Sequence, residues 1–161
     1  MWSRPLRRRR RRASPAPTHT RTPLRLTAES RVTASISDSR AWYIIDVTTG
    51  GSLDSAEHGH ELVLPTGREI VVTGHERPST LRWRDAHPDT GTTGSGGLLT
   101  LKSWIDNSTT ITLTHHIDLP AGTSWRVVTA RQDLLDADVK SHARAWVERL
   151  ARHGAATTGN T

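Results

Sequence analysis

Residues 109–119 read TTITLTHHIDL, and this stretch is the strongest indication of the fold in the chain. Apolar and polar residues alternate along it, which is typical of a β-strand with one buried face. The apolar face carries Ile111, Leu113, His115, Ile117 and Leu119, and the polar face carries Thr112, Thr114, His116 and Asp118. The stretch therefore predicts a sheet into whose apolar face a histidine, His115, points.

Short β-rich runs separated by turn signals recur through the rest of the chain at intervals of roughly ten residues, which indicates an all-β body. The predicted strands are 41–47, 60–64, 68–74, 80–84, 98–105, 109–119 and 124–130, the last three forming a meander. A Pro-Thr-Gly turn at 65–67 predicts a hairpin. The Gly-rich segment 87–97 predicts a flexible loop.

The hydrophobic period changes near the C-terminus and predicts an amphipathic helix over about 133–153. Apolar residues recur there at steps of three and four, at Leu135, Val139, Ala143, Trp146, Val147 and Leu150. Asp133 is a suitable N-cap and Gly154 a suitable stop. The predicted fold is mainly β, a small sandwich or partly open barrel, with this helix packed on it.

The positive charge of the chain is concentrated at its N-terminus. Residues 1–31 hold ten arginines and one glutamate, whereas residues 32–161 carry a net charge of −3. The N-terminal part is also rich in Pro and Thr and has no hydrophobic period, which is typical of disorder. We therefore expect a disordered basic leader at 1–31, a single domain at 32–154 and a disordered tail at 155–161.

The leader contains an unbroken run of arginines that we interpret as a binding element for nucleic acid or another polyanion. The run consists of Arg7, Arg8, Arg9, Arg10, Arg11 and Arg12. Such a run binds phosphates without sequence preference and in a salt-sensitive manner. The alternatives are an anionic membrane surface, a solvated tail without a partner, or an upstream extension from a misplaced start codon.

Several classes of protein are excluded or disfavoured by what the sequence lacks. The chain has no cysteine, which excludes disulfides, thiolate catalysis and Cys-based zinc sites. It has no apolar run of the length of a transmembrane helix and no apolar core of a secretory signal after the arginines. We therefore expect a cytoplasmic protein without a transmembrane segment. The nucleophile elbow of α/β-hydrolases and the Walker loop are also absent.

Three histidines suggest a metal site on the β body. His58 and His60 are two residues apart, a spacing at which a strand presents two imidazoles on one face. Together with His115, or with His75 in its place, they predict a three-histidine centre with an open position, suited to Zn or Fe. The alternative is that His115 is a core histidine with a satisfied hydrogen bond and the others lie on the surface.

Trp104 is a candidate partner-binding residue. It falls on the same strand face as Thr100 and Lys102, opposite the apolar residues of the predicted strand 98–105. An exposed aromatic side chain among polar residues stacks on a base or sugar or anchors a partner. The alternative is a core position against the C-terminal helix.

The sequence thus favours a non-enzymatic binding or interaction module, tethered to nucleic acid or another polyanion through its arginine run. One alternative is a metal-dependent enzyme that uses the histidine cluster. The other is a structural or assembly subunit, in which the basic arm neutralises packaged nucleic acid and the β body contacts further copies of the chain.

Overall fold

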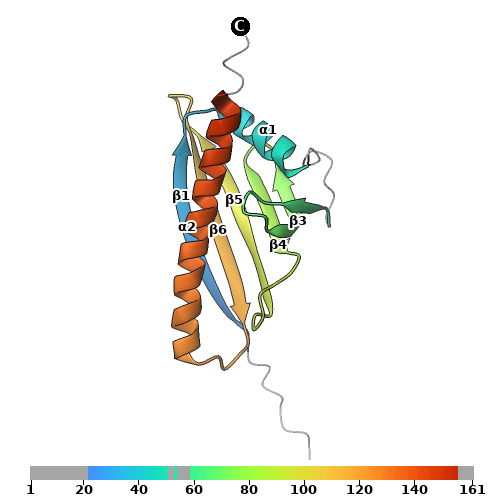
Figure 1. The fold of residues 1–161 in the computed structure, drawn as a ribbon, viewed down its shortest axis with the longest axis vertical. Coiled ribbons are helices and arrows are strands. Elements are labelled where there is room, and N and C mark those ends of the chain that lie inside the picture. The colour runs from blue at the N-terminus through green and yellow to red at the C-terminus, as the bar shows by residue number, and fades with distance from the viewer. Residues whose placement is uncertain (1–21, 51–52, 54–58, 156–161) are drawn as a thin grey trace, which may run out of the picture.

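A computed structural model describes residues 22–50, 53 and 59–155 of the chain. Its main feature is one antiparallel sheet that packs against a long helix (Figure 1). The strands are β1 (Leu24–Ala34), β2 (Glu61–Val63), β3 (Glu69–Glu76), β4 (Thr80–Asp85), β5 (Gly94–Ser103) and β6 (Thr109–Leu119), and the helices are α1 (Asp38–Thr49) and α2 (Trp125–Ala155). The strand order is β1-β6-β5-β4-β3-β2. The prediction of a mainly β domain with one C-terminal amphipathic helix is confirmed.

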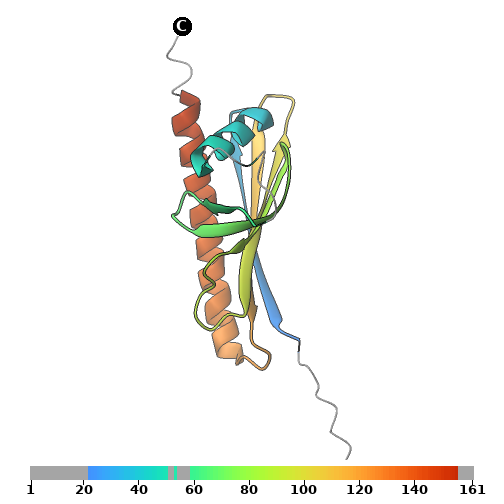
Figure 2. The same ribbon diagram turned by 90° about the vertical axis from the view of Figure 1, so that its right-hand side faces the viewer.

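Both helices lie on the same side of the sheet, and the core fills the space between them (Figure 2). Inward-facing residues alternate with outward-facing ones along β6 as the sequence predicts, and every residue of its apolar face is buried. The predicted stripe of α2 supplies the opposite wall through Leu135, Val139, Ala143, Trp146 and Leu150, all buried. Burial of these apolar faces is the main force that holds helix and sheet together.

The N-terminal boundary of the folded part is earlier than predicted. Residues 24–31, which we expected within the disordered leader, form most of β1 and pair with β6 from Leu24↔Leu119 to Arg31↔Thr112. Leu26 and Ala28 of this segment are buried. Its alternation was masked by the neighbouring basic and Pro-rich residues, and its pairing partner lies about ninety residues away in the sequence. Residues 1–21 and 156–161 are outside the described part of the chain.

Residues 41–47 form part of α1, not the predicted strand. The β-branched residues of AWYIIDV suggested a strand, but its buried positions Ala41, Trp42, Ile44 and Ile45 follow a helical period. The helix also has the usual end signals, because the Ser37 side chain accepts from the Arg40 N–H and Gly50 follows with φ 128°. These caps outweigh the β propensity.

Residues 124–130 are likewise helical, since α2 begins at Trp125 instead of near residue 133. Strand β6 pairs with β1 on one edge and with β5 on the other. The chain that leaves β6 therefore has no free edge to join as the third strand of a meander, and it turns back as a helix. The described part of the chain contains no helix long and apolar enough to cross a membrane.

The predicted hairpin around residues 65–67 is confirmed as β2–β3, and it bends toward α2. The register between β3 and β4 shifts between Val72 and Gly74, a bulge that bends the strand. The predicted loop 87–97 is shorter than expected, because Gly94–Gly97 belong to β5. Here Trp83, Gly97 and His115 are cross-strand neighbours in one row.

The glycine at position 97 makes room for the Trp83 indole. A Cβ atom built on Gly97 would lie 2.3 Å from Trp83 Cζ2, and one on Gly96 would lie 2.4 Å from the Trp83 carbonyl oxygen. The indole in turn meets His115 edge-on, with ring centroids 5.8 Å apart. The absence of a side chain at Gly97 therefore allows the indole to lie against the sheet, where it meets His115.

We expect Gly97→Ala to lower the free energy of unfolding by about 3 kcal/mol or more, because neither the indole nor the adjacent strand has room to retreat. Gly74→Ala is the matched control: it lies in strand β3 of the same sheet, and a Cβ there meets nothing within 4 Å. Its effect should stay within about 1 kcal/mol. Urea denaturation measures both, and equal effects of the two substitutions would contradict this account of Gly97.

Candidate functional site

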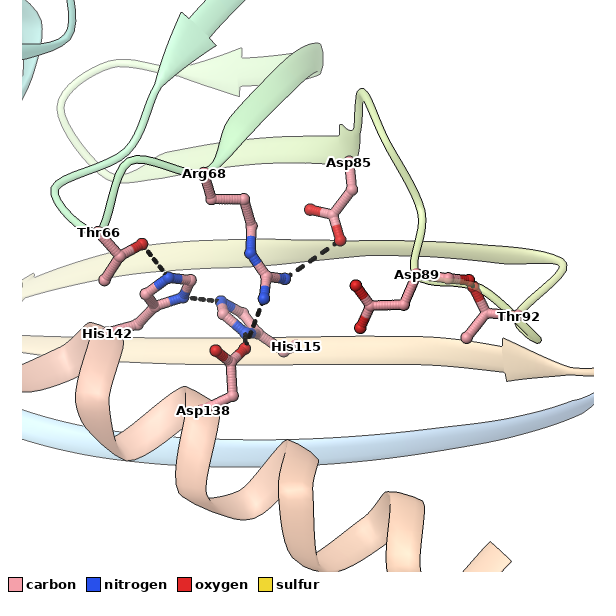
Figure 3. A network of polar contacts seen from close by, with 8 residues as sticks. All are labelled: Thr66, Arg68, Asp85, Asp89, Thr92, His115, Asp138 and His142. Atoms are coloured by element: carbon pink, nitrogen blue, oxygen red, sulfur yellow. Dashed lines mark hydrogen bonds and ion pairs between the residues drawn. The ribbon is translucent and has the colours of Figure 1, made fainter. Parts of the chain in front are cut away.

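The polar site of the protein lies where the β2–β3 turn meets α2 and β6 (Figure 3). His115 is the polar member of the buried face of β6, and only 1% of it is exposed. Asp138 and His142 are four residues apart on α2 and therefore share one helix face. The turn before β3 contributes Thr66 and Arg68. Three segments far apart in the sequence thus build one cluster.

These side chains form a continuous line of hydrogen bonds. Asp138 Oδ2 lies 3.1 Å from His115 Nδ1, and His115 Nε2 lies 3.0 Å from His142 Nδ1. His142 Nε2 in turn pairs with Thr66 Oγ1. At the other end Arg68 donates to Asp138 Oδ2 at 2.9 Å and to Asp85 Oδ2 at 3.1 Å.

When both imidazoles are neutral, all the hydrogen bonds of this line between Thr66 and Asp138 must donate in the same direction, toward Asp138. The ionised carboxylate of Asp138 accepts only, so His115 donates from Nδ1 and accepts at Nε2. His142 must then donate from Nδ1 and accept at Nε2. The acceptor at the end of the line leaves the Thr66 hydroxyl as a donor. The carboxylate thus fixes the tautomers of both rings and the orientation of a hydroxyl three partners away.

Burial keeps His142 neutral. Desolvation lowers the pKa of His142 to about 4, and the nearby His115 acts in the same direction. For Asp138, burial by itself would raise the pKa, but the hydrogen bond from His115 and the charge of Arg68 outweigh it and hold the pKa below its usual value. A negative carboxylate and a neutral His142 are therefore the forms present near pH 7.

A cavity opens beside this cluster between the sheet and α2. One part, of about 400 Å³, is lined by Thr66, Gly67, Arg68, Glu69, Asp85, His87, Asp89, Asp138 and His142. The adjoining part, of about 250 Å³, is lined by Arg68, Asp85, Asp89, Ser95, Ile117, Arg131, Leu134, Leu135 and Asp138. The two parts share Arg68 and three carboxylates.

Two residues that line the cavity each contain a buried polar atom without a hydrogen-bond partner among the described residues. These atoms are Asp85 Oδ1 and Ser95 Oγ, and their residues are 6% and 7% exposed. The other carboxylate oxygen of Asp85 accepts from Arg68. An unsatisfied buried polar group costs about 1–3 kcal/mol, so these two atoms indicate where a bound molecule would complete the hydrogen bonding.

The cluster also contains the donor types of a metal centre. His115, Asp138 and His142 each offer a ligand atom, and these atoms lie within 4.8 Å of one another. However, the nitrogens of the two rings face each other in a hydrogen bond, and the second nitrogen of each ring is also engaged. A metal ion would have to displace one of these bonds, so the arrangement suits a proton relay better than a metal centre.

The predicted histidine triad is not assembled in the described part of the chain. His115 is buried in the cluster just described, whereas His60 is exposed ahead of β2 and separated from β6 in the sheet by β3, β4 and β5. His58 lies outside the described residues. A Zn or Fe site formed by these three residues stays a prediction, and the expectation that His115 points into the apolar layer agrees with its burial.

Trp104 lies at the β5–β6 turn and is half exposed. Its Nε1 donates to Thr110 Oγ1 at 2.8 Å, and Lys102 Nζ lies 4.7 Å from its ring centroid. The alternative of a core position against α2 is therefore wrong, and partner binding through Trp104 stays a prediction. Arg7, Arg8, Arg9, Arg10, Arg11 and Arg12 lie outside the described residues.

His142 and Asp138 were not among the predicted site residues, although the sequence contains a signal for them. His142 falls three residues after Val139 and four before Trp146, so it belongs to the buried stripe of the helix. A polar residue in such a stripe needs a partner, and Asp138 stands one turn earlier. Arg68 and Thr66 gave no such signal, because the bend of the β2–β3 hairpin brings them to the helix.

The comparisons with known proteins agree with the fold. No protein-family model and no curated protein matches this chain. Among solved structures, it is similar to a protein from Thermobifida fusca solved by NMR, with 14% identity, a TM-score of 0.58 and coverage of 78% of this chain and 93% of that one. It is also similar to a START superfamily protein from Mycobacterium smegmatis, with 11% identity, a TM-score of 0.57 and coverage of 78% and 97%.

A third similar structure is that of a norcoclaurine synthase point mutant from Thalictrum flavum in complex with a transition state analogue. The identity is 10%, the TM-score is 0.58, and the match covers 83% of this chain and 98% of that chain. At such low identities the similarity shows a shared fold. The sheet wrapped around a C-terminal helix is therefore the architecture that this protein has in common with START superfamily proteins.

The buried His142 makes the stability of the protein depend on pH. Its pKa is lowered to about 4 in the folded state, so between pH 6.5 and 4 the unfolded chain binds the proton and the folded chain does not. Stability should therefore fall as the pH falls through this window, by on the order of 3 kcal/mol from this residue. Urea denaturation at a series of pH values measures the effect.

The variant His142→Gln should lose most of this pH dependence. His116, whose pKa burial also lowers, remains in the variant and accounts for a residual slope. An unchanged slope in the variant, or an NMR titration that places the pKa of His142 near its ordinary value, would contradict the assignment.

Proposed function

We propose that this protein binds a small organic amine in the cavity between the sheet and α2. The observation that carries the proposal is the pair of unpartnered atoms on the wall, Asp85 Oδ1 and Ser95 Oγ. An ammonium group satisfies both, since it donates to the carboxylate and to the hydroxyl oxygen. The proposal keeps the interpretation of the chain as a binding module and gives it a ligand class.

The charges on the wall favour a cation over a neutral or acidic ligand. Four carboxylates line the cavity, those of Glu69, Asp85, Asp89 and Asp138, against the two guanidinium groups of Arg68 and Arg131. Arg68 is already engaged by two of the carboxylates, and Arg131 donates to the Thr90 carbonyl oxygen at 2.8 Å. The lining therefore has an excess of negative charge, which attracts a cationic ligand.

The rest of the cavity suits an apolar body attached to the amine. Ile117 of β6 and Leu134 and Leu135 of α2 line the inner part, opposite the polar residues. Small-molecule sites commonly combine such an apolar wall with a few polar groups that fix orientation. One neighbour with this fold, norcoclaurine synthase, was solved with a transition state analogue bound, which supports a ligand-binding use of the architecture.

We expect 2-phenylethylamine to bind the full chain in isothermal titration calorimetry, and 2-phenylethanol, its neutral counterpart, to bind at least tenfold more weakly. Asp85→Asn should weaken amine binding about tenfold or more, since a hydrogen bond to a charged group contributes about 1.5–3 kcal/mol. Ser95→Ala should have a smaller effect in the same direction.

Asp106→Asn is the matched control, because this carboxylate is exposed on the β5–β6 turn and bonds only to Ser108 among the contacts described. Its amine affinity should equal that of the unaltered chain. Equal affinities for amine and alcohol, or an unchanged affinity in Asp85→Asn, would refute an amine site.

The arginine run carries a second, separate candidate function, the binding of nucleic acid. Ten of the arginines fall within the first 31 residues, while the rest of the chain is mildly acidic. Such an arm would bring the ligand-binding body to a polyanion through counterion release. The observation that favours it is this separation of charge along the chain.

The test is fluorescence anisotropy of a labelled DNA duplex with the full chain and with a chain that starts at residue 22. Starting at residue 32 would remove most of β1 and unfold the sheet. Only the full chain should bind, with affinity falling about 10³-fold between about 50 and 200 mM salt if all six arginines contact phosphate. Replacement of residues 7–12 by glutamine should abolish binding, and equal binding by both chains would contradict the role of the arm.

A further inference from the structure

We propose that Thr66 is the nucleophile of an acyl-transfer site, with His142 as its general base. His115 and Asp138 are positioning residues that hold the base in its reactive tautomer. The substrate class is a small carboxylic ester that enters the outer part of the cavity, and the net reaction is its hydrolysis. This activity goes beyond amine binding and involves a different part of the wall.

The geometry is that of an activated hydroxyl. Thr66 is exposed on a turn and lines the cavity, and its Oγ1 pairs with Nε2 of the buried His142. A nucleophile in hydrogen-bond contact with a base, and a base oriented by a further group, are the parts that covalent catalysis by a hydroxyl requires. Here the orienting group is itself an imidazole, that of His115, which Asp138 orients in turn.

The direction of the hydrogen bonds supports the assignment of His142 as the general base. With His115 donating to Asp138, each ring accepts on its Nε2 side, so the Thr66 proton already points at the His142 lone pair. The two remaining lone-pair directions of Oγ1 stay available to an electrophile. If the line ran the other way, His142 would donate to Thr66 and offer no base. The ion pair of Arg68 with Asp138, at 2.9 Å, favours the ionised carboxylate that sets the productive direction.

Arg68 is the group that stabilises the negative charge of the tetrahedral intermediate. The backbone N–H of Gly67, next to the nucleophile, donates to the Leu64 carbonyl oxygen at 2.8 Å and is therefore engaged. The Arg68 guanidinium lines the same cavity, and those of its five N–H groups that do not bond to Asp85 or Asp138 can donate to the oxyanion. The site thus relies on side-chain N–H donors where many hydrolases use backbone donors.

The reaction proceeds in two balanced steps. Thr66 Oγ1 attacks the ester carbonyl carbon while its proton passes to His142 Nε2. The C–O bond to the alcohol then breaks, and the alcohol leaves with the proton from His142. Water attacks the Thr66 ester in the second step and gives a proton to His142, which returns it to Thr66 Oγ1 as the acid departs. The imidazolium formed in each step is stabilised by Asp138 through His115.

The experiment uses the full chain with p-nitrophenyl acetate as the acyl donor. We expect release of nitrophenolate with a burst, and peptide mass spectrometry that places one acetyl group on Thr66. Thr66→Ala should abolish both, and Thr66→Ser should retain both. Thr123→Ala is the matched control, because that hydroxyl also lies in a turn but donates to the Pro120 carbonyl oxygen and not to an imidazole.

The base and its positioning residues have separate readouts. His142→Gln should slow acetylation about a hundredfold or more. Asp138→Asn should also slow it at least tenfold, and NMR of the His142 ring should show the proton moved from Nδ1 to Nε2, because an amide can donate to His115. A purely structural role of Asp138 would lower stability without reversing the tautomer.

The pH profile gives a further check. Burial is the main cause of the lowered pKa of His142, which is about 4. Of the charged and titratable groups that face it, His115 of β6 and Arg68 before β3 lower the pKa further, and Asp138 of α2 opposes them. The acylation rate should therefore fall on the acid side near pH 4, not near the ordinary histidine pKa.

Three outcomes would overturn the proposal: an acetyl group only on residues other than Thr66, acetylation of Thr66 at the same rate in His142→Gln, or activity that a chelator abolishes and Zn²⁺ restores. The last result would make the cluster a metal centre instead. Amine binding by Thr66→Ala is measured in parallel, so loss of acyl transfer with amine binding retained separates this inference from the proposed function.

Discussion

The organisation of the site depends on one constraint, the burial of a single imidazole in the apolar face of β6. The other inward-facing side chains between Ile111 and Leu119 are aliphatic, and His115 interrupts them at the centre of the sheet. A buried ring nitrogen without a partner costs free energy comparable to a lost hydrogen bond. The helix that covers this strand must therefore present polar groups at that level, and α2 does so with Asp138 and His142.

That requirement also explains why the cavity is polar. Asp138 is a half-buried carboxylate, and it is stabilised by Arg68 from the bent β2–β3 hairpin. Arg68 in turn holds Asp85 at the end of β4. Gly97 of β5 leaves room for the Trp83 indole, which meets the His115 ring edge-on. A line of charge and hydrogen bonds thus extends from the centre of the sheet to the mouth of the cavity, each group compensating for the burial of the one before it.

The elements that depend on local sequence patterns were predicted correctly, and those that depend on distant partners were not. Strands with a strict alternation, such as β6, and the helix with a regular apolar stripe were predicted with the correct type, because a two-layer packing requires those periods. The errors occurred where a partner distant in the sequence determines which secondary structure a segment adopts. Residues 41–47 and 124–130 have strand-like composition, but they form parts of α1 and α2, and both sides of β6 are occupied by β1 and β5. The first residues of β1 resemble the basic segment before them until the pairing with β6 is known.

The candidate site was predictable only in part, for the same reason. His115 was identified because its strand places it among aliphatic residues. The sequence suggested His58 and His60 as its partners, since two histidines two residues apart are a familiar pattern, whereas Asp138 and His142, which contact it in the structure, are inconspicuous in a charged helix. The curvature of the sheet, which brings Thr66 and Arg68 to α2, has no local sequence signature apart from the bulge at Gly74.

The unpartnered atoms of Asp85 and Ser95 differ from the rest of this network, and the difference favours a binding role. Every ring nitrogen and the shared carboxylate oxygen of the relay have partners, so the relay stabilises itself. Asp85 Oδ1 and Ser95 Oγ have no such partners, and each of these buried atoms lowers the stability of the free protein by about 1–3 kcal/mol. Hydrophobic residues at these positions would remove that cost. A ligand that donates to these two atoms would recover on binding the free energy lost in folding.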